Sequence, residues 1–203
     1  MLTDRFSDAL TYAEEVHRRQ NRKGTEVPYV AHLLAVCALV LEHGGDEDQA
    51  IAALLHDMVE DQGGLARLNE IREKFGERVA DMVAACSDAV TSPKPPWDQR
   101  KQKYLALLAE HDPAIRLVSC ADKLHNARAI LRDYESQGNE VWQRFNGGKQ
   151  GTLWYYRSLA DRYLALNLGP MAVELKRVVT RLEEAAGGLD TQTTSKPKVS
   201  SKA

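Results

Sequence analysis

The chain has 203 residues, of which 43% are hydrophobic, and this is enough to build one hydrophobic core. Its 27 Lys and Arg residues nearly balance 29 Asp and Glu residues, so the formal charge of -2 gives no overall attraction to nucleic acid or to an anionic membrane. The three cysteines, Cys37, Cys86 and Cys120, are widely spaced and odd in number, which favours reduced thiols in a reducing compartment.

The N-terminal segment MLTDRFSDALTYAEEVHRRQ carries charges throughout, so it lacks the apolar stretch of a secretory signal. The longest apolar run, Leu33 to Leu41, is too short to cross a bilayer. We therefore expect a cytoplasmic protein without a membrane anchor.

The first half of the chain predicts three helices. Apolar residues at helical spacing indicate an amphipathic helix from Asp4 to about residue 20. Residues 30–43 are apolar on nearly every side and predict a buried helix that ends at two glycines. Asp46 is then expected to cap a third helix, which we expect to continue to about residues 63–64.

The second half also predicts helices. Residues 65–88 indicate two helices with a break near Gly76, and the prolines within 93–96 exclude regular structure until a helix resumes around Trp97. Asp112 and Pro113 are expected to open a long helix to about Tyr134, followed by a loop rich in glycine. Two more helices follow, separated by a Gly-Pro pair.

Residues 187–203 have almost no apolar side chains and predict a disordered tail. No segment shows convincing strand alternation. The predicted fold is therefore an all-α bundle, with a single domain over residues 1–186.

Four polar side chains interrupt the third predicted helix. His56 and Glu60 are four residues apart, as are Asp57 and Asp61, so each pair shares a helix face. A buried carboxylate is costly unless a charge or a hydrogen bond compensates it. The pattern therefore raises the question of what binds here: a metal, a substrate or solvent.

Similar interruptions occur in two other apolar helices, where His32 begins one and Asp122 and Asn126 lie in another. Together with His56 and Asp57 they offer imidazole nitrogens and carboxylate oxygens, a mixed set suited to Mn²⁺, Fe²⁺ or Zn²⁺. Each residue alone has an ordinary structural reading, such as a core histidine or a solvated helix end. Their joint occurrence favours a metal site built from separate helices of a bundle.

The segments PYVAHLLAV, AALLHDMVED and CADKLHNARAIL resemble the HD-domain hydrolases of the RelA/SpoT family, most closely the small stand-alone alarmone hydrolases. The resemblance implies that His32, His56, Asp57 and Asp122 hold a Mn²⁺ ion. It also implies that Glu60 and Asp61 are the catalytic pair beside the attacking water. The reaction implied is removal of the 3′-pyrophosphate from guanosine tetra- or pentaphosphate (ppGpp or pppGpp).

The resemblance further implies that Arg22, Lys23 and Asn126 contact the nucleotide. Cationic side chains that could also reach phosphates follow the proline-rich stretch, and a later aromatic ring could stack on the purine; these are Lys94, Arg100, Lys101 and Tyr155. A solvated helix face explains such cations about equally well, and aromatic residues at helical spacing are more often part of the core.

Two other functions remain open from the sequence. One is an HD nucleotidase or phosphatase that acts on another nucleotide, such as an adenosine alarmone or NADPH. The other is a regulatory protein that binds a nucleotide without catalysis, against which the acidic pair after the His-Asp dipeptide argues. A homo-oligomer is compatible with the sequence.

Overall fold

The computed structural model describes residues 1–61, 63–87 and 95–187, with only the backbone of Asp61 described. Within these ranges the regular structure is helical, apart from one antiparallel bridge between Asn21 and Pro28. The elements are α1 (Asp4–His17), α2 (Val30–Glu42), α3 (Glu47–Leu55), α4 (Met58–Asp61), α5 (Gly64–Phe75), α6 (Glu77–Cys86), α7 (Trp97–Leu107), α8 (Pro113–Gln137), the 3₁₀ helix η1 (Gly138–Arg144), α9 (Gly148–Ala165) and α10 (Pro170–Ala185).

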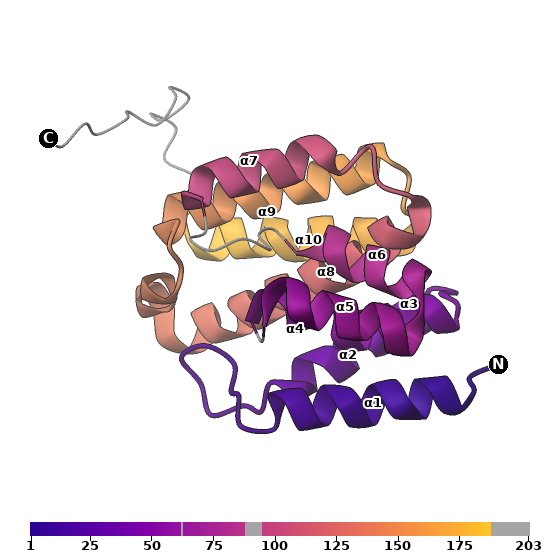
Figure 1. Cartoon of the computed structure of the whole chain (residues 1–203). Helices are drawn as coiled ribbons and strands as arrows, with labels where there is room; N and C mark the ends of the chain where they lie inside the picture. Colours follow the sequence, from indigo (N-terminus) through magenta and orange to yellow (C-terminus); the bar gives the residue numbers. More distant parts are fainter. Residues whose placement is uncertain (62, 88–94, 188–203) are drawn as a thin grey trace, which may run out of the picture.

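The long helix α8 lies in the middle of the bundle (Figure 1). It packs against α2, α3 and α6 in the first half of the chain and against α9 and α10 in the second half. Leu124 and Ala127 of α8 have no exposed surface. A side chain on α8 is therefore close to residues that are far away in the sequence.

Local signals explain where several helices begin. The Asp46 carboxylate accepts a hydrogen bond from Gln49 N, and Gln49 Oε1 accepts one from Asp46 N, so α3 starts with a complete capping box. Asp112 accepts from Ala114 N, and Pro113 occupies the first turn of α8. These starts confirm the predicted helices.

Two predicted segments differ from the structure. The third predicted helix does not continue to residues 63–64: α3 ends at Leu55, His56 and Asp57 form a turn, and α4 begins at Met58. In that turn His56 Nδ1 bonds to Ala53 O at 2.7 Å, so the side chain takes a carbonyl near the end of the helix. The predicted loop after α8 contains η1.

The predicted disordered tail, 187–203, lies outside the described residues except for Gly187. None of the helices in the described ranges is long and apolar enough to cross a membrane.

Candidate metal centre and adjoining pocket

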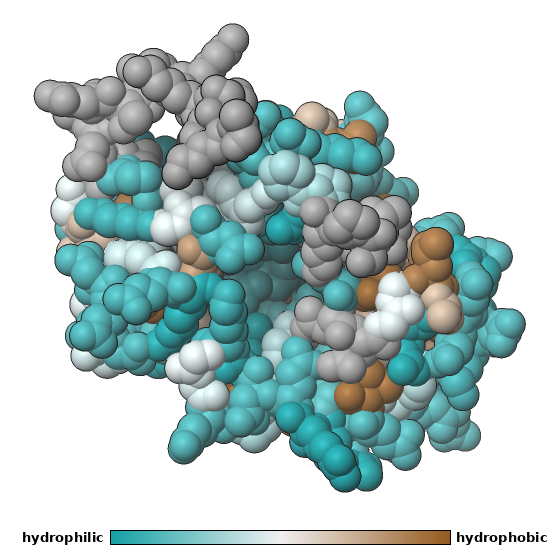
Figure 2. Space-filling view, turned by 60° about the vertical axis from the view of Figure 1, so that its left-hand side comes forward, coloured by the Kyte–Doolittle hydropathy of each residue, from teal (hydrophilic) through white to brown (hydrophobic). Residues whose placement is uncertain are grey.

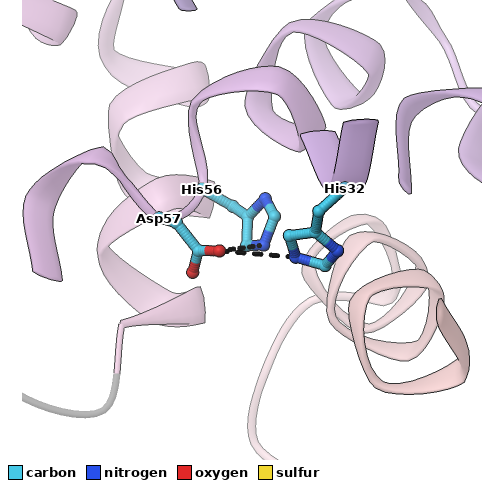
Figure 3. Close-up of side chains that lie close together, drawn as sticks. All are labelled: His32, His56 and Asp57. Atoms are coloured by element: carbon cyan, nitrogen blue, oxygen red, sulfur yellow. Dashed lines mark ion pairs between the residues drawn. The ribbon is translucent and has the colours of Figure 1, made fainter. Parts of the chain in front are cut away.

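Three separate parts of the chain bring two imidazoles and two carboxylates together. His32 lies in the first turn of α2, His56 and Asp57 form the turn between α3 and α4, and Asp122 lies in α8. Both histidines and Asp122 are buried, and Asp57 is partly exposed. Figure 3 shows His32, His56 and Asp57 converging, with a carboxylate oxygen of Asp57 facing both rings.

The distances suit a single cation. His32 Nε2 lies 3.4 Å from Asp57 Oδ2 and 3.3 Å from Asp122 Oδ1. His56 Nε2 lies 3.1 Å and 3.6 Å from the same two oxygens. Ligands about 2.0–2.2 Å from a shared ion are themselves about 3.0–3.6 Å apart. His32, His56 and Asp57 therefore have the spacing of a metal-binding set, and Asp122 lies near the free nitrogen of both histidines.

The Nε2 atoms of both histidines are buried and have no hydrogen-bond partner among the described residues. Because His56 Nδ1 bonds to a backbone carbonyl, Nδ1 is the donor and the lone pair of Nε2 faces the carboxylates. A lone pair facing anionic oxygens is repulsive unless a positive charge lies between them. This arrangement fits a metal ion.

The pKa shifts of His56 and Asp57 also indicate that the cluster favours positive charge. Burial alone would lower the pKa of His56, but the charges of Asp57 and Asp122 outweigh it and raise the pKa well above its usual value. Burial alone would raise the pKa of Asp57, but the two histidines lower it well below its usual value. The cluster thus attracts a proton or a cation to its centre.

A second layer of side chains orients the cluster. Tyr29 donates its hydroxyl hydrogen to Asp57 Oδ2 at 2.5 Å, Lys123 Nζ donates to Asp122 Oδ2 and Asn126 donates to Asp122 Oδ1. Sequence reasoning missed the roles of Tyr29 and Lys123. Lys123 directly follows Asp122, but nothing in the sequence pattern marked the tyrosine.

His125 is a further member of the cluster that the sequence analysis did not assign to it. Its Nδ1 lies 2.7 Å from Nδ1 of His32. Burial, followed by the effect of His32, lowers the pKa of His125 to about 4, so near neutral pH its Nδ1 can accept a hydrogen bond from His32. Its spacing of one helical turn from Asp122 was the signal that could have identified it.

A pocket of about 730 Å³ adjoins the cluster at His32. Three predicted substrate-binding residues, Arg22, Lys23 and Asn126, line it. Figure 2 views the molecule from the side of the α1–α2 loop and η1, where the surface is hollowed and largely hydrophilic. Other residues of the lining that the sequence did not single out include Arg132, Asp133, Arg144 and Tyr156.

Among the described residues, Arg100, Lys101, Tyr155 and Glu60 are not part of the lining of this pocket. Arg100 donates to Pro95 O, and Lys101 Nζ lies 4.8 Å from the ring centre of Tyr155, which is buried. Glu60 is half-buried in α4. Lys94 and the side chain of Asp61 lie outside the described residues.

Comparisons with known proteins find related sequences. The family model described as "HD domain" matches residues 9–153. The guanosine-3′,5′-bis(diphosphate) 3′-pyrophosphohydrolase MESH1 of Xenopus tropicalis is 39% identical over 128 residues, which cover 62% of this chain and 69% of that protein. A guanosine-3′,5′-bis(diphosphate) 3′-pyrophosphohydrolase of Aquifex aeolicus is 35% identical over 76% of this chain, but the match spans 21% of that longer protein.

Two solved structures share the fold. A crystal structure of lmo0812 from Listeria monocytogenes has a TM-score of 0.65 and 28% identity, covering 73% of this chain and 96% of that chain. A structure reported under the words "A metazoan ortholog of SpoT hydrolyzes ppGpp and plays a role in starvation responses" has a TM-score of 0.68 and 25% identity, covering 93% and 99%. With its helical bundle and its His-Asp cluster, the chain belongs to the HD-domain family.

Proposed function

We propose that this protein is a Mn²⁺-dependent pyrophosphohydrolase that removes the 3′-pyrophosphate of ppGpp and pppGpp, producing pyrophosphate and GDP or GTP. The observation that carries the proposal is the pair of buried Nε2 atoms that face two carboxylates beside a pocket lined by basic side chains. Relatives and a structural neighbour that bear the name of this activity support it.

The metal would be held by His32, His56, Asp57 and Asp122. Nitrogen and oxygen ligands without thiolates suit Mn²⁺ among the divalent ions that such a set accepts. When bound, the ion would supply a Lewis acid that polarises a phosphoryl oxygen and lowers the pKa of the attacking water.

The substrate is a polyanion, so it needs positive charge and hydrogen-bond donors in the pocket. Arg22 and Lys23 from the α1–α2 loop would bind phosphates, and Asn126 on α8 would orient the ribose side of the nucleotide. We propose that cations of α7 and the preceding segment meet the outer phosphates, and that an aromatic ring of α9 borders the base; these are Lys94, Arg100, Lys101 and Tyr155.

In the reaction, the oxygen of water bonds to the phosphorus that carries the ribose 3′ oxygen. The bond between this phosphorus and the 3′ oxygen breaks. Pyrophosphate leaves, and the 3′ oxygen takes up a proton. We propose that Glu60 and Asp61 accept the proton from the attacking water and return one to the leaving oxygen. Their place in α4, directly after the turn formed by His56 and Asp57, supports this role.

The free cysteines support the cytoplasmic location proposed here. Cys37, Cys86 and Cys120 are all buried and unpaired, as expected in a reducing compartment. Self-association stays a prediction.

The test combines metal analysis with product analysis. We expect purified protein to bind Mn²⁺ and to release pyrophosphate and GDP from ppGpp, to lose activity with a chelator and to regain it when Mn²⁺ is added. Asp57→Ala is expected to lose metal and activity together, whereas Asp81→Ala, an exposed change on α6, keeps both. Full turnover by metal-free Asp57→Ala would contradict the proposal.

The choice of substrate is tested on a nucleotide panel. Guanosine tetraphosphate, adenosine tetraphosphate and NADPH are compared at equal concentration, with chromatography to identify each product. Preferred cleavage of the adenosine compound, or release of phosphate from NADPH, would replace the proposed substrate. Metal binding without cleavage of any of the three would instead indicate a regulatory protein.

A further inference from the structure

Tyr29 occupies a constrained position between the α1–α2 loop and the metal cluster. It lies directly before α2, three residues before His32, and is buried. Its backbone N donates to Gln20 O at 2.8 Å, and its carbonyl accepts from His32 N at 2.9 Å. The backbone of the residue is thus hydrogen-bonded at both ends, and its side chain is held by a separate contact of the hydroxyl.

The hydroxyl of Tyr29 bonds to the oxygen of Asp57 that faces both histidines of the cluster. Asp57 Oδ2 accepts this hydrogen bond at 2.5 Å and is the same atom that lies 3.4 Å from His32 Nε2 and 3.1 Å from His56 Nε2. A carboxylate oxygen has two lone-pair directions. With one taken by the hydroxyl, the other is directed to the centre of the cluster.

The ring of Tyr29 contacts the cation proposed to bind substrate phosphate. The guanidinium carbon of Arg22 lies 5.4 Å from the ring centre, within the range of a cation–π interaction. The same guanidinium donates to Asn126, which donates to Asp122. Arg22 is therefore connected to both carboxylates of the cluster, in one case through Tyr29 and in the other through Asn126.

We propose that Tyr29 is a positioning residue that couples Arg22 to the metal ligand Asp57: its hydroxyl orients the carboxylate and its ring orients the guanidinium. The inference rests on the proposed function, because it assigns Arg22 to the substrate. The two contacts use different parts of the side chain. They can therefore be removed one at a time.

Tyr29→Phe removes the hydroxyl and keeps the ring. We expect the Kd for Mn²⁺, measured by calorimetric titration of chelator-treated protein, to rise about 10- to 100-fold, the usual effect of losing a hydrogen bond to a metal ligand. We expect kcat for ppGpp to fall and KM to stay within about twofold, because Arg22 keeps its aromatic neighbour.

Tyr29→Leu removes both contacts. We expect its Kd for Mn²⁺ to match that of Tyr29→Phe, and its KM for ppGpp to rise severalfold further. The matched control is Tyr12→Phe, which deletes a hydroxyl bonded to Glu70 at 2.6 Å on the surface of the α1–α5 contact. This control is expected to keep the wild-type Kd and kcat.

Melting curves of chelator-treated protein separate a loss of folding from a loss of positioning. Tyr29→Phe is expected to melt within a few degrees of wild type without metal and to gain less stability than wild type when Mn²⁺ is added. A wild-type Kd and kcat in Tyr29→Phe would overturn the proposal, as would equal KM values for the Phe and Leu variants. If wild-type protein does not cleave ppGpp, the proposed function fails, while the Mn²⁺ titrations still test the role of the hydroxyl.

Discussion

At the scale of single residues, Asp122 contacts both imidazoles of the candidate metal centre and the side chains that surround them. One of its oxygens faces the two imidazoles and accepts from Asn126, and the other accepts from the half-buried ammonium of Lys123. Asp57, on the other side of the two imidazoles, is partly exposed. The hydrogen bond described for its carboxylate comes from the neutral hydroxyl of Tyr29 and not from an ammonium group. Two ligands of the same chemical type are therefore expected to differ in their effect on folding.

Asp122→Ala is expected to lower the free energy of unfolding by about 3–5 kcal/mol, because Lys123 loses the carboxylate that compensates its charge. Asp57→Ala removes a proposed metal ligand whose neighbour His56 can lose its proton, so it should destabilise the metal-free protein less. Urea unfolding of both variants in the presence of a chelator measures the difference. Equal destabilisation would show that the Lys123 contact contributes little.

At the scale of elements, the start of α3 affects the position of His56, because His56 is the C-cap residue of this short helix. The capping box at Asp46 is joined to α6 by Arg78, whose Nη2 lies 2.7 Å from the carboxylate. The bond from Arg78, followed by the backbone bond from Gln49, lowers the pKa of Asp46 despite some burial. The cap is thus a charged one.

Asp46→Ala is expected to cost about 1 kcal/mol of stability at neutral pH, the typical effect of losing an N-cap. Since the folded pKa lies below the unfolded value, this contribution is complete above about pH 4 and is lost as the pH falls through the folded pKa. Denaturant titrations at neutral and acidic pH measure both effects. A difference between variant and wild type that does not shrink in acid would contradict the assignment.

The α1–α2 loop is a second element with a defined shape. Gly24 has a φ of 73°, and a Cβ atom there would lie 2.8 Å from Arg144 Nε. Arg144 is held in turn by Asp133 at 2.7 Å, and both line the pocket with Arg22. Glycine therefore suits the backbone conformation, and any larger residue would displace the Arg144 side chain.

Gly24→Ala is expected to destabilise the protein by about 1–2 kcal/mol through its positive φ and, by displacing the loop, to raise KM for ppGpp severalfold. Gly44→Ala is the matched control, with a φ of 81° but open space around the added Cβ. It should show a similar loss of stability with an unchanged KM. Equal KM values for both variants would indicate that the loop does not position the substrate.

At the scale of the whole molecule, the helical fold could be predicted from the sequence, and the structure brings the four residues proposed as ligands close together. Helical periodicity identified the buried faces, and His32 and Asp122 were recognisable as polar residues in apolar helices. The break at His56 was missed because the apolar spacing continues past it. In the structure the His56 side chain bonds to Ala53 O at this break. The place of Tyr156 in the pocket lining was missed, because adjacent residues of a helix point about 100° apart and the orientation of α9 about its axis depends on packing.

A metal ion that joins α2, the α3–α4 turn and α8 is expected to stabilise the whole bundle. Ligand binding to the folded state alone adds about 2.7 kcal/mol when the ion is present at 100 times its Kd. For a chain of this size, that corresponds to a rise in Tm of roughly 5–10 °C. Thermal melts with Mn²⁺ and with a chelator measure it, and Asp57→Ala should show no rise. An equal rise in that variant would indicate that the ion binds elsewhere.

The distribution of the ligands along the chain also constrains biosynthesis. His32, His56 and Asp57 are made early, whereas the helix that carries Asp122 is made much later. A nascent chain on the ribosome therefore has an incomplete set of ligands until α8 has emerged and packed. Tight binding of the cation should accordingly follow the synthesis and packing of α8.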